Sequence, residues 1–259
     1  MSAILEFEQV TKRLGGRTVL DRVDLAVERG EIFVLVGASG MGKSVSLKHM
    51  IRLLTPDSGA VRVDGERIDE ARGRALERIR DRFGVLFQGA ALLQWMSVAD
   101  NVALPLREKT RLSESAIAER VHACLELLGL EESADAAPAE LSGGMRKRVG
   151  LARAIVGEPE IILYDEPTSG LDPVTSRHID GVIGDLRDRL GVTSVVVTHD
   201  LHSALAIGTR IAVIDRGRIV ECASPAAFVR SRNETVQAFL AAQHITRTGD
   251  WEEGNRHGK

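Results

Sequence analysis

A glycine-rich segment near the start of the chain has the residue types and the spacing that bind phosphate groups. It follows the pattern G-x-x-x-x-G-K-[ST], and its residues are Gly37, Ala38, Ser39, Gly40, Met41, Gly42, Lys43 and Ser44. Glycines let a backbone curl so that successive N–H groups point at phosphate oxygens, and the helix that follows adds the positive end of its dipole. We expect Lys43 to contact the β- and γ-phosphates of a nucleotide and Ser44 to offer a hydroxyl ligand to Mg²⁺. The alternative is an ordinary glycine-rich turn, and the flanking pattern of a buried strand and a helix argues against it.

Two carboxylates further along the chain could hydrolyse the bound triphosphate. The apolar run from Ile161 to Tyr164 predicts a strand, which Asp165 ends and Glu166 follows. A carboxylate at the carboxyl end of a strand can hold the Mg²⁺ shell, and the next one can polarise a water molecule for in-line attack on the γ-phosphate. By itself, an Asp-Glu pair after a strand is more often a solvated turn. Beside the phosphate loop, we interpret Asp165 as a metal ligand and Glu166 as a general base.

The elements that position these residues alternate between strands and helices. Alternating apolar and polar residues predict strands over 4–10 and 18–27, and the almost unbroken apolar run over 31–36 is typical of a strand buried on both faces. The other expected strands are 61–63, 160–164, 192–197, 210–215 and 218–221, and the expected helices are 43–54, 73–81, 113–128, 141–154, 174–190 and 200–208. This order predicts a doubly wound α/β core with a helical insertion between its halves, followed by a polar tail from His244 onward.

Composition excludes several classes of protein. Of 259 residues, 44% are hydrophobic and 27% charged, which excludes a disordered chain, a collagen and a disulfide scaffold. Acidic residues outnumber basic ones by 37 to 34 and aromatic residues make up 3%, so we expect no nucleic-acid partner. Two cysteines outside any CxxC motif favour a reducing compartment. The chain contains neither an apolar run long enough to span a bilayer nor an evident export signal, so we expect any membrane role to be played from the cytoplasm through a partner.

Further motifs extend the pattern, and together they resemble the ATP-binding subunits of ABC transporters over about residues 4–240. The segment 141–145, LSGGM, resembles the family's LSGGQ signature, and 169–172 resembles its D-loop. Gln88 is similar to the family's Q-loop glutamine and His199 to its switch histidine. A lone histidine after an apolar strand is usually structural, but five motifs in the correct order are highly specific.

This resemblance implies an α/β fold with a P-loop NTPase core. In it, a mostly parallel sheet with flanking helices carries an N-terminal antiparallel β subdomain and an inserted helical subdomain at about 89–157. The ABC ATPase domain would span 1–243, and 244–259 would be a polar tail. The implied catalytic residues are Glu166, His199 and Gln88; the implied Mg²⁺ ligands are Ser44, Gln88 and Asp165; ATP would contact the phosphate loop together with Ser142, Gly143, Gly144 and Asp172.

The resemblance also implies how two copies work together. In the family, a homodimer forms head to tail, and each signature segment caps the γ-phosphate bound to the partner's phosphate loop, so that ATP lies at the interface. Two departures stand out. Met145 replaces the usual glutamine, and Leu14, Gly15, Gly16 and Arg17 stand where the family usually carries an aromatic residue that stacks on adenine. We therefore expect base stacking to be weak or replaced by apolar or guanidinium contacts.

Within the family, the chain most resembles the ATPases of MCE-type (Mla-like) lipid transport systems. The residues that carry this resemblance are 87–92, 101–108, Met145, 191–193 and 198–200. It implies a multi-pass permease at the cytoplasmic side of the inner membrane, an MCE-type lipid-binding protein beyond it, and phospholipid or another hydrophobic cargo. Three alternatives stay open: a transporter branch that imports small polar solutes, a non-transport ABC ATPase of DNA repair or ribosomes, and an idle interaction module. The absence of heptads and of a second cassette argues against the second, and the complete catalytic set against the third.

Two smaller features each allow two readings. Leu92, Leu93, Trp95 and Met96 could line a groove for the permease or belong to the core of the helical subdomain. Trp251 stands among acidic residues in the tail, where it could anchor on a partner copy or be incidental.

Overall fold

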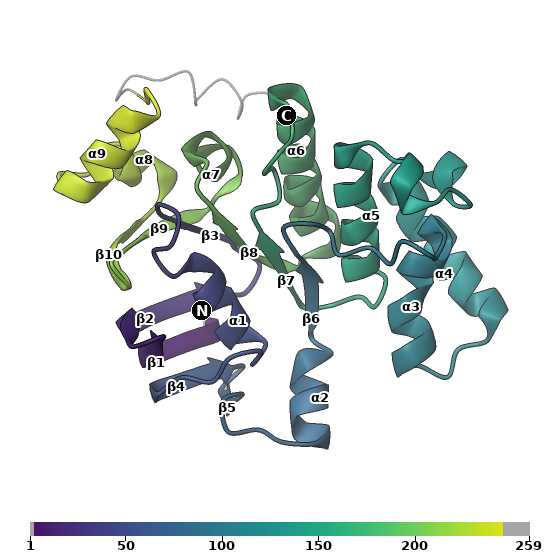
Figure 1. Ribbon diagram of the computed structural model, residues 1–259, viewed down its shortest axis with the longest axis horizontal. Coiled ribbons are helices and arrows are strands. Elements are labelled where there is room, and N and C mark those ends of the chain that lie inside the picture. Colours follow the sequence, from purple (N-terminus) through teal and green to yellow (C-terminus); the bar gives the residue numbers. More distant parts are fainter. Residues whose placement is uncertain (1–2, 246–259) are drawn as a thin grey trace.

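Two β-sheets organise the computed structural model, which describes residues 3–245 (Figure 1). The smaller sheet is antiparallel with the strand order β2-β1-β4-β5. The larger has the order β10-β9-β3-β8-β7-β6; strands β9 to β6 are parallel and β10 pairs with β9 antiparallel. The strands are β1 (Ala3–Leu14), β2 (Arg17–Glu28), β3 (Ile32–Val36), β4 (Ser58–Val63), β5 (Glu66–Arg67), β6 (Phe83–Leu86), β7 (Ile161–Asp165), β8 (Thr193–Thr198), β9 (Arg210–Asp215) and β10 (Arg218–Ala223). The expected α/β fold, with a mostly parallel core and an N-terminal antiparallel sheet, is confirmed.

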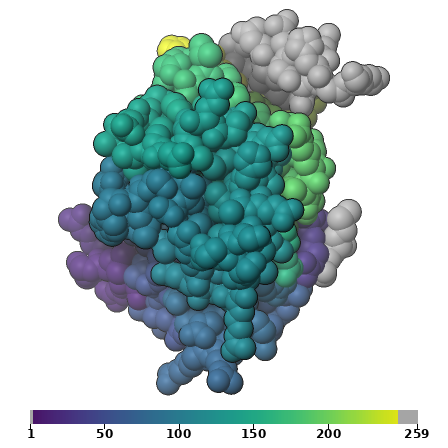
Figure 2. Space-filling model, turned by 90° about the vertical axis from the view of Figure 1, so that its right-hand side faces the viewer, coloured from purple at the N-terminus to yellow at the C-terminus, as the bar shows by residue number. Residues whose placement is uncertain are grey.

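Helices cover the larger sheet, and one group of them lies at one end of the molecule. Figure 1 shows α3, α4 and α5 grouped at one end of the molecule and α8 and α9 near β10 at the other, and Figure 2 shows the face that the first group forms. The helices are α1 (Lys43–Met50), α2 (Arg74–Arg80), α3 (Val98–Lys109), α4 (Glu114–Leu127), α5 (Gly143–Ile155), α6 (Pro173–Leu190), α7 (Leu201–Ile207), α8 (Pro225–Phe228) and α9 (Glu234–Ala242), with short 3-10 turns at Glu131–Ser133 and Pro138–Glu140.

Side-chain caps explain where several helices begin. Ser113 accepts a hydrogen bond from the Ala116 N–H at the start of α4, and Ser142 accepts one from the Met145 N–H at the start of α5. The first expected helix is shorter than predicted: α1 ends at Met50 and not at residue 54. Arg52 adopts a left-handed backbone (φ 53°), and the N–H groups of residues 53 and 54 both donate to the Lys48 carbonyl, which ends the helical hydrogen-bond pattern. The structure adds strands β5 and β6 and helices α3, α8 and α9, which are not among the elements expected from the sequence.

The hydrophobic core lies on both faces of the larger sheet. Along β3, Phe33 and Leu35 face one cluster, which contains α1 and the antiparallel sheet, and Val34 and Val36 face the other, which contains α3 to α7. Both faces of β3 are fully covered, as its unbroken apolar run predicts. Buried residues of α3, α4 and α5 belong to the same cluster as the sheet, so the helical middle of the chain packs directly onto the core.

Two expectations fall wholly or partly outside the described residues. Trp251 lies outside them, as does the polar tail after residue 245. Across residues 3–245, none of the helices combines the length and the apolar character that crossing a bilayer requires.

Candidate nucleotide-binding and hydrolysis site

Four neighbouring parallel strands deliver the candidate residues to one edge of the larger sheet. The phosphate loop follows β3, His199 follows β8, Asp165 ends β7 and Gln88 comes shortly after β6. Val36 pairs with Thr198 in register, and Asp165 with Val197, so these strands end at the same level. The carboxyl edge of a parallel sheet is where ligands bind in open α/β folds. The predicted site residues thus come together because of sheet order, although up to about 160 residues separate them in the chain.

The backbone of the phosphate loop requires glycine at two places. Gly42 has φ 109°, and a Cβ there would lie 2.9 Å from the Val19 carbonyl oxygen and from the Leu20 side chain. A Cβ at Gly37 would lie 2.4 Å from the Ile214 carbonyl oxygen. Gly42 is also the N-cap of α1 and offers its N–H groups no side-chain cap, whereas Ser97, Ser113, Ser142, Asp172, Asp200 and Asn233 cap the helices that they begin. The uncapped start of α1 can therefore accept an anion.

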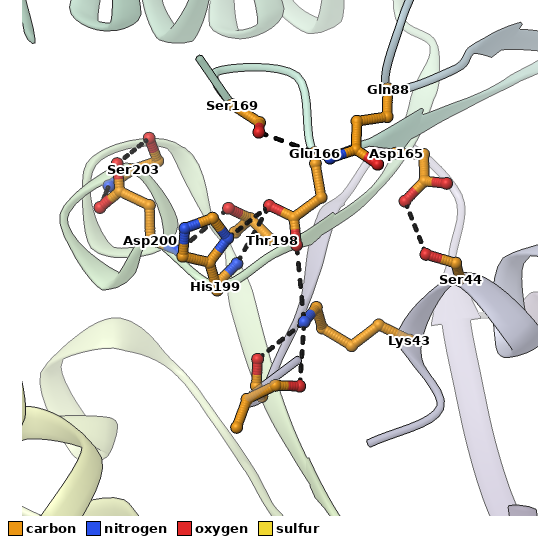
Figure 3. Close-up of polar contacts among 12 residues, drawn as sticks. Lys43, Ser44, Gln88, Asp165, Glu166, Ser169, Thr198, His199, Asp200 and Ser203 are labelled. Carbon is orange, nitrogen blue, oxygen red and sulfur yellow. Dashed lines mark hydrogen bonds and ion pairs between the residues drawn. The ribbon is translucent and has the colours of Figure 1, made fainter. Parts of the chain in front are cut away.

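Lys43 and Ser44 lie where the loop meets the two carboxylates (Figure 3). The buried Lys43 ammonium donates to the carbonyl oxygens of Gly37 (2.8 Å) and Ala38 (3.2 Å), and it lies 3.5 Å from Glu166 Oε1. Ser44 Oγ donates to Asp165 Oδ1 over 2.9 Å. A hydroxyl beside a carboxylate is the hard oxygen donor set that Mg²⁺ prefers. Burial raises the pKa of Asp165 above its ordinary value, and a bound cation would relieve this cost.

Glu166 is held from two sides. Its Oε2 atom lies 2.8 Å from His199 Nδ1 and accepts the His199 N–H over 3.3 Å, while Oε1 faces Lys43. Glu166 as a whole is 9% exposed. Its backbone is left-handed (φ 49°), a conformation that costs about 1–3 kcal/mol for a non-glycine residue and often marks a functional site. A buried carboxylate with one oxygen fixed by a histidine can accept a proton from a water molecule at the other.

The remaining predicted residues lie at the border of this cluster or apart from it. Gln88 is exposed, and its Nε2 atom lies 3.5 Å from Ser169 Oγ (Figure 3). Ser142 is exposed at the start of α5, and within residues 3–245 no hydrogen bond or ion pair joins the segment 142–144 to the phosphate loop. Instead, a Cβ at Gly144 would clash with the Thr175 side chain at 2.5 Å, so the signature packs against the start of α6. Asp172 caps α6 by accepting the N–H groups of Val174 and Thr175.

The structure reveals two cations of α5 that the sequence analysis missed. The buried Lys147 ammonium donates to the carbonyl oxygens of Gln88 and, over 3.1 Å, of Glu166. Burial lowers the pKa of Lys147, and the nearby carboxylates oppose that shift. Arg153 donates to the carbonyl oxygens of residues 90 (2.6 Å) and 91 (2.8 Å), both of which have a left-handed backbone. Lys147 stands four residues before the apolar Leu151, and this helical spacing was the available signal that it lies on the buried face.

The apolar segment after Gln88 divides between core and surface. Leu92 is 8% exposed and belongs to the core, Leu93 and Met96 are half-buried, and Trp95 is 79% exposed. The four side chains therefore differ in burial, from the core position of Leu92 to the exposed ring of Trp95. A pocket of about 450 Å³ lies between β6, α3 and α5. Its lining includes Phe83, Val85, Phe87, Leu104, Pro105, Lys109 and Arg153.

Comparisons with known proteins show which family the chain is similar to. Residues 20–169 match the family model described as "ABC transporter". Over 253 residues, the chain is 40% identical to the "Probable ribonucleotide transport ATP-binding protein mkl" of Mycobacterium leprae, covering 98% of this chain and 73% of that protein. Over 221 residues, it is 43% identical to the "Methionine import ATP-binding protein MetN 2" of Rhodopseudomonas palustris, covering 85% of this chain and 58% of that protein.

Solved structures show the same fold. The ATP-binding cassette MJ0796, in a dimeric post-hydrolysis state bound to ADP and Pi, matches with a TM-score of 0.78 and 34% identity over 85% of this chain and 98% of that one. The cbiO1 protein from Clostridium perfringens, part of the ABC transporter complex cbiONQ, matches with a TM-score of 0.81 and 28% identity over 95% of this chain and 100% of that one. The family match spans more than half of the chain and includes the phosphate loop and both carboxylates. The chain therefore belongs to the ABC transporter family and is an ATPase that binds ATP with Mg²⁺.

Proposed function

We propose that this chain is the ATP-hydrolysing motor subunit of a membrane transporter and that Glu166 is its general base. The observation that carries this proposal is the pairing of the buried Glu166 carboxylate with His199 on one oxygen and Lys43 on the other. Because His199 holds Oε2 in place, the carboxylate can receive the proton of a water molecule that attacks the γ-phosphate. His199 then stabilises the glutamate in the orientation that the reaction needs.

The loop residues bind and orient the triphosphate. Lys43 exchanges its two carbonyl partners for phosphate oxygens, and the uncapped N–H groups of α1 donate to the same phosphates. Ser44, Asp165 and Gln88 would hold Mg²⁺, which neutralises charge on the β- and γ-phosphate oxygens when it is bound. The Ser44–Asp165 hydrogen bond supports this assignment, because it already brings together a hydroxyl and a carboxylate.

We infer that two copies act together, head to tail, with ATP at the interface. The exposed Ser142 and the two glycines after it form a helix N-terminus that, within the described residues, makes no hydrogen bond or ion pair with the phosphate loop of its own chain. A second copy could bring this anion-binding end to the γ-phosphate. The dimeric form of the MJ0796 relative supports the same arrangement.

We propose that the chain lies on the cytoplasmic side of the inner membrane, bound to a multi-pass permease. The 450 Å³ pocket between β6, α3 and α5 is the docking site that we assign to the permease, and the exposed Trp95 follows β6 in the chain. We expect no nucleic-acid partner. We assign residues 89–157 to an inserted helical subdomain and residues 244–259 to a polar tail.

Two cargoes are supported by different observations. Phospholipid or another hydrophobic molecule, moved through an MCE-type complex, is supported by the resemblance of residues 87–92 and 101–108 to MCE-type ATPases. Import of a small polar solute is the second candidate, favoured by the names of relatives that refer to ribonucleotide transport and methionine import. Purification of the chain with its membrane partners separates them: an MCE-type protein supports lipid transport, and a solute-binding protein for small polar molecules refutes it.

The base assignment is tested by Glu166→Gln. The amide keeps the size of the side chain but cannot accept a proton. We therefore expect the ATP turnover rate to fall below a hundredth of the wild-type rate, which corresponds to an increase of about 3 kcal/mol or more in the activation free energy, while ATP binding is retained. Glu158→Gln is the matched control, because Glu158 is a glutamate with a 78% exposed side chain at the other end of β7. Turnover by Glu166→Gln near the control's rate would show that another group is the base.

A further inference from the structure

The last helix that the structure describes reaches back to the catalytic histidine. Gln243, at the end of α9, donates from Nε2 to the His199 carbonyl oxygen over 2.6 Å and accepts the Leu201 N–H at Oε1 over 2.8 Å. Its own carbonyl oxygen lies 3.2 Å from His202 Nε2. More than forty residues separate Gln243 from the segment that it contacts, so this is a tertiary contact and not a consequence of local geometry.

The two side-chain hydrogen bonds use both halves of the Gln243 amide. The segment offers one acceptor, the His199 carbonyl, and one donor, the Leu201 N–H, on either side of Asp200. The primary amide of glutamine presents an NH₂ donor and a carbonyl acceptor side by side at the end of the side chain, which matches this pair of backbone groups. The Asp200 carboxylate already accepts the N–H groups of His202 and Ser203, so Gln243 satisfies an N–H at the start of α7 that this cap leaves unpaired.

These bonds hold the backbone that carries the His199 ring. The ring is 62% exposed, so packing alone does not hold it, and its contact with Glu166 depends on where its backbone lies. Glu166 Oε2 fixes the His199 N–H on one side of the residue, and Gln243 fixes the His199 carbonyl on the other. A shift of this backbone would move Nδ1 away from the base that it orients.

Helix α9 is itself held by the core. Val236 and Leu240 are buried in the cluster that covers the larger sheet, and Phe239 packs against it. Gln243 therefore reaches the His199 segment only when α9 is docked. We propose that Gln243 is a positioning residue for the His199–Glu166 pair, so that the docking of α9 sets the rate of ATP hydrolysis but not the affinity for ATP. This inference rests on the roles of Glu166 and His199 in the proposed function.

The test compares two variants of Gln243 with a control on the same helix. Gln243→Met keeps the length but makes neither hydrogen bond, and Gln243→Glu keeps the acceptor while it loses the donor to the His199 carbonyl. Gln237→Met is the control, because Gln237 is a half-buried glutamine of α9 whose Nε2 atom donates to the Ser231 carbonyl, away from the site. For each variant, kcat and KM for ATP, the Kd of ATP and the melting temperature are measured on the full chain with Mg²⁺.

We expect both Gln243 variants to lower kcat by about tenfold, with the Kd of ATP within about twofold of wild type, and the control to keep its kcat. In a His199→Ala background, measured in single-turnover experiments, Gln243→Met should have no further effect, because it acts through His199. Gln243 variants that melt like the control and keep its kcat would overturn the inference. An undiminished effect of Gln243→Met without His199 would also overturn it.

The same experiments separate this inference from the proposed function on which it rests. If His199→Ala turns over ATP at the wild-type rate, the role assigned to His199 is wrong, and the inference falls with it. If His199→Ala is slow and the Gln243 variants are normal, the inference alone is wrong. Gln243→Glu has nearly the same volume as glutamine, and it provides the comparison if Gln243→Met does not fold.

Discussion

Replacing Asp180 by asparagine should stabilise the protein at neutral pH. Asp180 lies on α6, is 3% exposed, and its Oδ2 atom accepts a hydrogen bond from Ser203 Oγ (2.9 Å) and pairs with Arg177 (3.0 Å). Its Oδ1 atom has no partner among the residues that the structure describes. Burial raises the pKa of Asp180 from 3.8 to about 6; Arg177 and Ser203 oppose the rise, and Asp200 adds to it.

The size and the sign of the effect follow from this shift. Between pH 3.8 and about 6, the folded protein holds a proton on Asp180 that the unfolded chain has released, so the free energy of unfolding falls as the pH rises. Above pH 6, the ionised carboxylate lowers the free energy of unfolding by its full contribution, which for a pKa shift of about two units is about 3 kcal/mol. An asparagine does not titrate and keeps an oxygen for Ser203.

Urea denaturation of wild type and Asp180→Asn from pH 4.5 to pH 8 measures this contribution. Across this range, the unfolding free energy of the variant should rise relative to that of wild type by about 2 kcal/mol. The change is smaller than the full contribution of about 3 kcal/mol because part of the titration lies below pH 4.5. Asp188→Asn is the control, because Asp188 is on the same helix with a 63% exposed side chain. A difference between wild type and Asp180→Asn that stays constant with pH would refute the reasoning.

Three further predictions concern the site and its surroundings. Lys147→Met should lower kcat by about tenfold to a hundredfold with little change in the Kd of ATP, because the carbonyls of Gln88 and Glu166 lose their donor. Steady-state ATPase assays on this variant and on Lys147→Arg measure the effect, and an unchanged kcat contradicts it. ATP and GTP should bind within about tenfold of each other, or 1.4 kcal/mol, because residues 14–17 offer no aromatic ring to the base; a titration that shows strong preference for ATP contradicts this. Leu104→Asp should abolish the stimulation of ATPase activity by the permease but keep the basal ATPase rate, because Leu104 lines the pocket away from the phosphate loop. Stimulation of the variant at the wild-type level would contradict the assignment of the pocket as the docking site.

The parts of the fold that the sequence predicted well are those whose signals are local. Ser113 and Ser142 cap helices that begin one residue later, and the apolar run of β3 is buried on both faces. Helix α3 was missed because Pro105, a residue that normally ends helices, lies inside it. The helix still forms because Ser97 caps it and its buried face, with Val98 and Val102, packs into the core.

The candidate site divides in the same way. The phosphate loop and the two carboxylates at the end of β7 could be predicted directly, because their chemistry depends on neighbours in the chain. Lys147, Arg153 and Gln243 bind main-chain carbonyls that lie between 19 and 63 residues away in sequence. Every residue has a carbonyl, so the partners of such side chains leave no pattern in the sequence. Only the folded structure identifies these contacts.

Helix α5 connects the pocket to the base by a continuous set of contacts. Arg153, at one end of the helix, lines the pocket and holds residues 90 and 91 in a left-handed backbone that they would otherwise avoid. Lys147, less than two turns earlier on the same helix, holds the carbonyls of Gln88 and Glu166. Because an α-helix transmits displacement along its axis, the segment 88–91 and Glu166 must follow α5 when it moves, or lose the hydrogen bonds that Lys147 and Arg153 donate to their carbonyls. We therefore expect a partner that fills the pocket and displaces Arg153 to change the position of Glu166 without touching ATP.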